Sequence, residues 1–245
     1  MDSAIKNGDI RVLDEFLAAN KKDGLPLVYT SNAIDLACSN GHVAVLDWFW
    51  DNGVELKYSS AAADWAASGG HIDVLEWFKT KPKKLTFTWT DIVAHACDEG
   101  HVEVLEWLRS NVPGVFDANN LKGEDVVDDA SAKGHVNVLD WWLKQSDLPF
   151  SYTGLALSHA ARSGHIDVLE WFASHGLELK STPLNWDSDK DLKPEVLAWY
   201  ERNRENIKFE TDESAYTSGS PTRSESWVRV HEDAFGLHDK RTNKI

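Results

Sequence analysis

The chain has 245 residues, a formal net charge of −15 at pH 7 and 42% apolar residues, and it contains twelve Trp. An acidic chain repels phosphate backbones, so we expect no nucleic-acid partner and favour a protein or peptide, in particular a basic one. Its two Cys are too few for a disulfide scaffold, and no run of 18 apolar residues is present to cross a membrane.

The beginning of the chain predicts a terminal structural unit. No apolar run follows Met1, so no secretory signal is expected. Residues 9–17 are predicted to form an amphipathic helix with its charged side chains facing outward, as a terminal unit requires. We therefore expect an intracellular protein, cytoplasmic with a nuclear location left open.

One stretch is repeated along the chain. Residues 100–107 read Gly-His-Val-Glu-Val-Leu-Glu-Trp, and close copies follow four other glycines, with weaker copies near both ends. The glycines that align these copies are Gly8, Gly41, Gly70, Gly100, Gly134 and Gly164. A period of about 30 residues with helical patterning is typical of a solenoid of two-helix units.

Residues 30–53 show how one unit is built. The small and apolar run 33–38 predicts a first helix that ends at Gly41, because Gly adopts a positive φ at low cost. His42 then begins a second helix whose apolar side chains recur at helical spacing on one face. We interpret the repeated His as a local cap of this second helix.

This pattern resembles the ankyrin repeat. The resemblance rests on the small-residue first helices, for example residues 36–38, 65–67 and 160–161, on the Gly-His link and on the Val-Leu second helix closed by Gly. It covers residues 1–206 and implies an all-α solenoid of about six units, followed by a capping helix over residues 194–203. It also implies a protein-interaction module whose concave face lies beside the residues that precede each aligned Gly.

Residues 207–245 are predicted to form a tail. They are rich in Ser and Thr and show no helical face. The short apolar segments 227–230 and 235–237 leave two interpretations open: a tail docked on the array, or a disordered tail that carries a linear motif.

One Trp position is shared by successive units. Its members are Trp48, Trp77, Trp107, Trp141 and Trp171, and Trp199 continues the column. Leu or Val flanks each Trp on the same helix face, so we predict that the column is buried in the core. Stacking platforms for bases or sugars are the alternative, which the acidic charge disfavours.

A second aligned position, five residues before Gly, holds polar residues in three successive units: His95, Asp129 and His159. In the family this position faces between units. We predict a buried polar ladder in which Asp129 binds both His rings, so that Asp129→Ala destabilises the protein more than Asp128→Ala. A metal site or a catalytic centre built on the same three residues is the alternative.

Candidate partner-binding residues lie next to the first helices. Four aromatic residues just precede these helices and three charged residues precede the aligned Gly: Tyr29, Tyr58, Trp89 and Tyr152, with Asp98, Glu99 and Arg162. Exposed aromatic side chains are good anchors for a partner, and packing against their own helix is the alternative.

Together these patterns predict a monomeric, non-enzymatic scaffold that binds a protein or peptide on an acidic concave face. We expect no catalytic residue, no metal and no cofactor. A role as the targeting arm of a larger protein is a further alternative.

Overall fold

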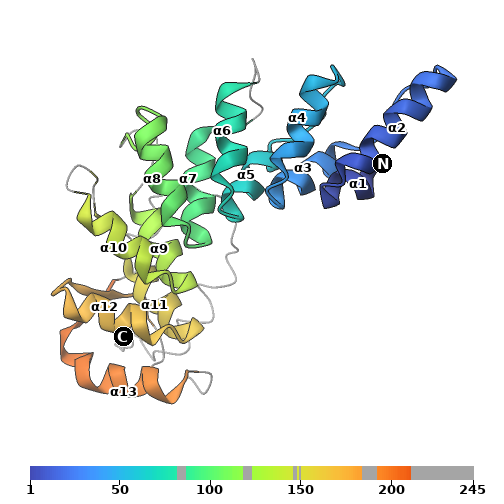
Figure 1. Cartoon of the computed structure of the whole chain (residues 1–245). Helices are drawn as coiled ribbons and strands as arrows, with labels where there is room; N and C mark the ends of the chain where they lie inside the picture. Colours follow the sequence, from blue (N-terminus) through green and yellow to red (C-terminus); the bar gives the residue numbers. More distant parts are fainter. Residues whose placement is uncertain (82–86, 118–122, 146–147, 149, 184–191, 211–245) are drawn as a thin grey trace, which may run out of the picture. The chain divides into compact units, whose positions relative to one another are not determined.

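Helices form nearly all of the regular structure in the computed structural model (Figure 1). The structure describes residues 1–81, 87–117, 123–145, 148, 150–183 and 192–210. These residues lie in one unit, Met1–Glu210. The predicted tail, apart from residues 207–210, lies outside the described residues.

The described chain forms six pairs of helices and then a short terminal segment. The pairs are α1 (Asp2–Asn7) and α2 (Ile10–Asp23), α3 (Ser31–Ser39) and α4 (Val43–Asp51), α5 (Ala61–Ser68) and α6 (Ile72–Thr80), α7 (Trp89–Asp98) and α8 (Val102–Asn111), α9 (Gly123–Lys133) and α10 (Val136–Lys144), and α11 (Gly154–Ser163) and α12 (Ile166–Ser174). The terminal segment contains β1 (Leu179–Ser181), α13 (Pro194–Asn203), the 3-10 helix η1 (Arg204–Asn206) and β2 (Ile207–Phe209).

The aligned glycine makes the turn inside each pair. Gly100 has a φ of +77°, a conformation that only Gly adopts readily. The chain reverses there, and the backbone N–H of His101 donates to the carbonyl of Ala96 at 2.8 Å, which closes the end of α7. The second helix of the pair then begins one residue later, at Val102.

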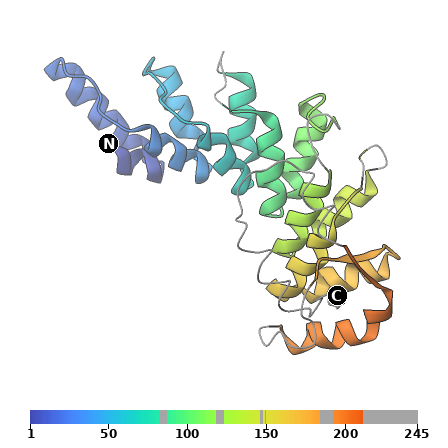
Figure 2. The same cartoon turned by 180° about the vertical axis from the view of Figure 1, so that it is seen from behind.

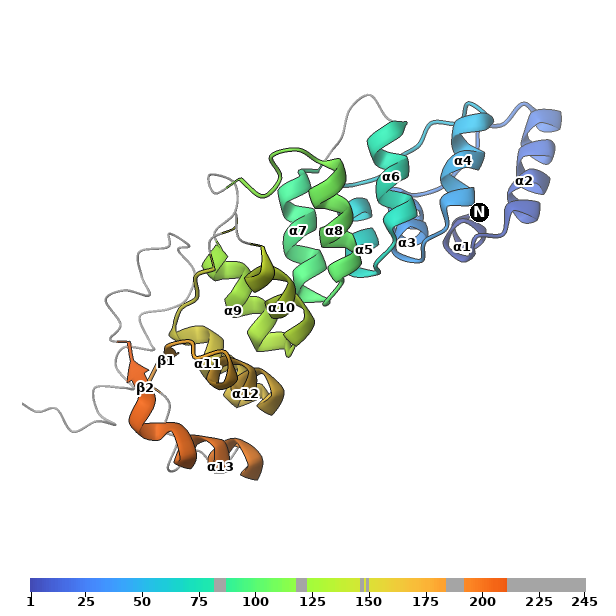
Figure 3. The same cartoon turned by 60° about the vertical axis from the view of Figure 1, so that its left-hand side comes forward.

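The pairs stack in chain order and form two layers (Figures 1 and 2). The first helices α1, α3, α5, α7, α9 and α11 pack on one another, and the second helices α2 to α12 form the other layer. Strand β1 packs on α11 and α13 packs on α12, so the terminal segment covers the last pair (Figure 3). Among the described residues, no helix has both the length and the apolar character needed to cross a bilayer.

The core lies between the two layers and between adjacent pairs. Small side chains fill the first helices, for example Ala37 and Ala66, both fully buried. Larger side chains such as Leu75 and Phe78 on the second helices are also fully buried. The small residues allow adjacent first helices to approach closely, and the large ones fill the wider space between second helices.

The terminal segment differs from the sequence-based expectation. Strands β1 and β2 pair in parallel, with Leu179 opposite Ile207, and the sequence pattern did not predict them. The Glu210 carboxylate accepts a hydrogen bond from the backbone N–H of Gly154 at 2.6 Å. Residues 207–210 therefore belong to the repeat unit, whereas the predicted boundary placed them in the tail.

The Trp column forms hydrogen bonds between successive units. Each indole N–H donates to the carboxylate that stands just before the Trp position of the preceding unit: Trp48 to Asp14 (2.7 Å), Trp77 to Asp47 (2.9 Å), Trp107 to Glu76 (3.1 Å), Trp141 to Glu106 (2.5 Å) and Trp171 to Asp140 (2.8 Å). Trp107 is half-buried and the other members, including Trp199, are buried. The last acid in the series, Glu170, pairs with Arg202 of α13.

The repeated His also connects units, which corrects its interpretation as a local cap. At His71, His101 and His135 no side-chain bond caps the helix that follows. Their Nε2 atoms instead donate to the carbonyls of Ser39, Ser68 and Asp98 in the preceding unit, at 3.0, 2.9 and 2.8 Å. Each ring lies against the aligned Gly of that preceding unit.

A third connection starts six residues before the aligned Gly. The carboxylates of Asp2, Asp35 and Asp128 each accept hydrogen bonds from both the backbone N–H and the hydroxyl of a residue at the start of the next unit, namely Thr30, Ser59 and Thr153. Ser158 makes the same contact with Thr182. This inter-unit Asp bond fixes where the following unit begins.

We expect Asp128→Ala to destabilise the protein by about 2–3 kcal/mol, because it removes two bonds to a buried carboxylate and leaves their donors unpaired. Asp129→Ala should change the free energy of unfolding by less than about 0.5 kcal/mol, because Asp129 is exposed. Urea unfolding of both variants measures the difference. This order reverses the sequence-based prediction, and a larger loss for Asp129→Ala would restore it.

Candidate binding surface on the first helices

The position five residues before the aligned Gly faces solvent, not the neighbouring unit. Trp65 is 37% exposed and Asp129 is exposed, while Leu36, His95 and His159 are half-buried. One residue corresponds to about 100° around a helix, so the preceding position, which includes Asp35, faces between units instead. We call the solvent-facing surface of α3, α5, α7, α9 and α11 the first-helix face.

The predicted His95–Asp129–His159 ladder does not form. No hydrogen bond or ion pair joins Asp129 to either His within the described chain, and His95 Nε2 lies 3.8 Å from Asp64 Oδ2 instead. The ladder prediction was wrong because it placed an exposed helix position at the interface. In the same described residues no group of three or more His, Cys, Asp or Glu is arranged to hold a metal ion.

A pocket of about 430 Å³ opens on the first-helix face, and we call it the Trp65 pocket. Its walls are Leu36, Ser39, Trp65, Ser68, Gly69 and Glu99, which come from α3, α5 and the turns that follow α5 and α7. Leu36 and Trp65 make one wall apolar, and Glu99 places an exposed carboxylate at the edge. An apolar side chain with a neighbouring cation fits these walls.

Acidic residues lie near one another on α7 and α9. Partial burial raises the pKa of Asp129, and the nearby carboxylates of Asp98 and Asp125 raise it further. The pKa of the His159 ring is lowered by burial and then by the positive charge of Arg162. The first-helix face is therefore negative on α7 and α9 and has a positive side chain farther along, on α11.

The aromatic residues that precede the first helices pack within their own units. Their ring centroids lie close to those of second-helix aromatics: Tyr29 to Phe49 at 4.9 Å, Tyr58 to Phe78 at 5.0 Å, Tyr152 to Phe172 at 4.9 Å and Trp89 to Trp107 at 5.8 Å. The hydroxyls of Tyr29 and Tyr152 donate to the carbonyls of Glu55 and Glu178. The rings therefore pack on the second helix of their unit, whereas the predicted alternative to partner anchoring was packing against their own helix.

The pKa values of the Tyr29 and Tyr152 hydroxyls are raised. Burial and the nearby Glu178 carboxylate raise the pKa of Tyr152 to about 12. Burial and the charge of Glu55 raise the pKa of Tyr29 in the same way. These hydroxyls therefore stay protonated and continue to donate to the backbone carbonyls across the physiological pH range.

The structure places the seven predicted partner-binding residues in three groups. Glu99 lines the Trp65 pocket, Asp98 lies near Asp129, and Arg162 stands at the end of α11. The four aromatics pack on second helices. The sequence pattern did not predict Leu36 and Trp65 as binding residues. A signal was present, because Trp65 stands at the position five residues before the aligned Gly, which is polar in the three units that follow.

Comparison with known proteins gives one informative result. No protein-family model matches the chain, and no curated protein matches its sequence. Among solved structures, the chain is similar to the ankyrin repeat domain of human ASB11, with a TM-score of 0.54 and 19% sequence identity. The match covers 82% of this chain and 96% of that domain. A likeness at this identity shows the fold, which is the one the repeat pattern predicted.

Proposed function

Because the chain has the ankyrin repeat fold, we propose that it is a non-catalytic interaction module that binds a protein or peptide on its first-helix face. The observation that carries this proposal is the Trp65 pocket, in which the exposed Trp65 ring stands beside Leu36 and Glu99. A large aromatic side chain exposed in a pocket is the usual centre of a protein interface, because its burial by a partner is favourable.

The partner segment that fits best carries an apolar side chain next to a basic one. The apolar side chain would contact Leu36 and Trp65. The basic side chain would lie near Asp98, Asp125 and Asp129. Burial raises the pKa of Asp129, and repulsion by the carboxylates of Asp98 and Asp125 raises it further. A cation placed there relieves this repulsion, so charge complementarity favours a basic partner.

Binding is supported over catalysis by the state of the reactive side chains. The thiols of Cys38 and Cys97 are buried, and burial raises both pKa values, so neither is a reactive thiolate. His95 Nε2 lies 3.8 Å from Asp64 Oδ2. We therefore assign no reaction to these residues.

The charge requirement is tested with a displayed library of random peptides. We expect the full chain to select peptides with Lys or Arg close to an aliphatic or aromatic residue, with affinity that falls as salt is added. The double variant Asp98→Asn/Glu99→Gln should bind a selected peptide about tenfold more weakly, and the control Glu195→Gln/Glu205→Gln on the terminal segment should not. Selected peptides without basic residues, or equal affinity in both double variants, would contradict the proposal.

A further inference from the structure

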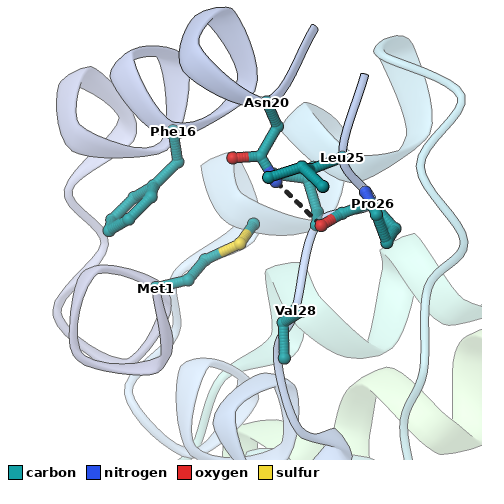
Figure 4. Close-up of a pocket in the computed structure, with 7 residues that line it drawn as sticks. Met1, Phe16, Asn20, Leu25, Pro26 and Val28 are labelled. Carbon is teal, nitrogen blue, oxygen red and sulfur yellow. Dashed lines mark hydrogen bonds between the residues drawn. The ribbon is translucent and has the colours of Figure 1, made fainter. Parts of the chain in front are cut away.

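A second pocket lies at the beginning of the array (Figure 4), and it shares no lining residue with the Trp65 pocket. It has a volume of about 320 Å³ and is lined by Met1, Phe16, Asn20, Leu25, Pro26, Leu27 and Val28. Most of its lining is apolar, and Phe16, Leu25 and Val28 are 39%, 63% and 81% exposed. We call it the Phe16 pocket.

The other units show what this pocket is built to hold. Phe16 stands eight residues after its aligned Gly, and the residues at that position in three other units are Phe49, Phe78 and Phe172, all fully buried. Each of those rings is covered by a Tyr that just precedes the first helix of the same unit, with ring centroids 4.9–5.0 Å apart. Phe16 has the same helix position but remains exposed.

The polar part of the arrangement is also present. The hydroxyls of Tyr29 and Tyr152 donate to the carbonyls of Glu55 and Glu178. Glu55 stands four residues before Ser59, and Glu178 four residues before Thr182; Ser59 and Thr182 are the residues that form the inter-unit bonds with Asp35 and Ser158. In the first unit the residue that forms this inter-unit bond is Thr30, so the equivalent carbonyl belongs to Pro26, four residues earlier. That carbonyl accepts a hydrogen bond from Asn20 Nδ2 at 2.8 Å (Figure 4). A carbonyl oxygen has two lone pairs, so it can accept a second donor.

We infer that the Phe16 pocket binds an aromatic side chain on an extended segment of a partner protein. The ring packs on Phe16 as Tyr29 packs on Phe49, and a tyrosine hydroxyl donates to the carbonyl of Pro26. Lys57, which lies over the ring of Tyr29, is replaced in the first unit by the exposed Val28, so a bound ring would meet an aliphatic side chain there instead of an ammonium group. This site does not depend on the first-helix face.

The probe is a peptide that already performs this packing inside the array: residues 54–60, Val-Glu-Leu-Lys-Tyr-Ser-Ser, acetylated and amidated at its ends. In NMR titration of the full chain, the signals of Phe16, Leu25 and Val28 should shift, with a dissociation constant on the order of 1 mM, the affinity that burial of one aromatic ring supports. The same peptide with Ala in place of Tyr should produce no shifts.

Two variants separate the pocket from the fold. Phe16→Ala should weaken binding about fivefold or more, and Leu25→Lys, at an exposed position that folding does not require, should do the same. Phe209→Ala, which removes an exposed ring at the other end of the array, is the matched control and should leave the affinity unchanged.

Several outcomes would overturn the inference. Equal binding of the Ala peptide, or shifts confined to other residues, would show that the pocket does not recognise an aromatic ring. Pocket signals that change in free protein with Trp227→Ala would identify the chain's own tail as the occupant, and signals that change with protein concentration would identify a second copy. Trp65→Ala should leave this titration unchanged, so failure here is distinct from failure of the proposed function.

Discussion

Gly100→Ala is expected to lower the free energy of unfolding by about 2–4 kcal/mol. The backbone of the Ala residue must adopt the positive φ of Gly100, which costs roughly 1–2 kcal/mol for a residue with a Cβ atom. Its Cβ would also lie 2.7 Å from His135 Nδ1, so the ring must move and its 2.8 Å bond to the carbonyl of Asp98 is lost. Breaking that bond in a packed interface adds about 1–2 kcal/mol. Urea unfolding measures the total.

The matched control for this substitution is Gly53→Ala. Gly53 also has a positive φ, +62°, but a Cβ added there meets nothing within 4 Å. We expect only the conformational cost, about 1–2 kcal/mol. In a double-mutant cycle, Gly100→Ala should cost less when His135 is already Ala. Equal losses for Gly100→Ala and Gly53→Ala would mean that the His ring does not hold the units together.

Trp77→Ala is expected to destabilise the protein by about 3–5 kcal/mol, the usual loss for removing a buried Trp. Trp77 is only 4% exposed and donates to Asp47 in the preceding unit. Trp77→Phe keeps most of the buried surface but leaves the Asp47 carboxylate without its donor, so we expect a smaller loss of about 1–2 kcal/mol. Chemical unfolding followed by far-UV circular dichroism measures both.

The control for Trp77 is Trp50→Ala, because Trp50 lies on the same layer of second helices but is 47% exposed. Its loss should stay below about 1.5 kcal/mol. The cycle that combines Trp77→Phe with Asp47→Asn should show coupling between the two residues. Independent losses would remove the Trp–carboxylate bond from the set of contacts that join the units.

The fold was predictable because the repeat is explicit in the sequence. The aligned glycines located the turns, and the Val-Leu-x-Trp stretch located the second helices. The predicted helical ankyrin repeat solenoid is confirmed, and the prediction rested on features that recur at the same position in each unit. Strands β1 and β2 are three residues each and occur once, so no repetition marked them, and their pairing joins Leu179 to Ile207 across the terminal helix.

The orientation of individual side chains was less predictable. The ladder prediction placed Asp129 between units, whereas Asp128, one residue earlier, makes the inter-unit bond. A difference of one residue rotates a side chain by about 100°, and a short helix of small residues does not define its buried face that finely. His101 was interpreted as a local cap because the sequence does not show that the preceding unit's Ser68 carbonyl lies within its reach.

The candidate sites depend on contacts between residues of different helices and units, which the sequence pattern does not show. The Trp65 pocket brings together residues from three successive units. Ser39, Ser68, Gly69 and Glu99 stand at the positions before the aligned Gly where the sequence placed the binding face, but Leu36 and Trp65 were not predicted to bind a partner. The Phe16 pocket becomes recognisable once Tyr29, Tyr58 and Tyr152 are seen to cover equivalent rings. In both cases the informative feature is a position at which one unit differs from the others.

The central claim is that the first-helix face binds a partner through Trp65, and one measurement tests it most directly. The dissociation constant of a library-selected peptide should be measured for the wild-type chain, Trp65→Ala and Trp50→Ala. We predict that Trp65→Ala weakens binding about 30-fold, as expected for an interface hot spot, and that Trp50→Ala changes it by less than about twofold. Equal affinity in all three proteins, with all three folded, would contradict the account.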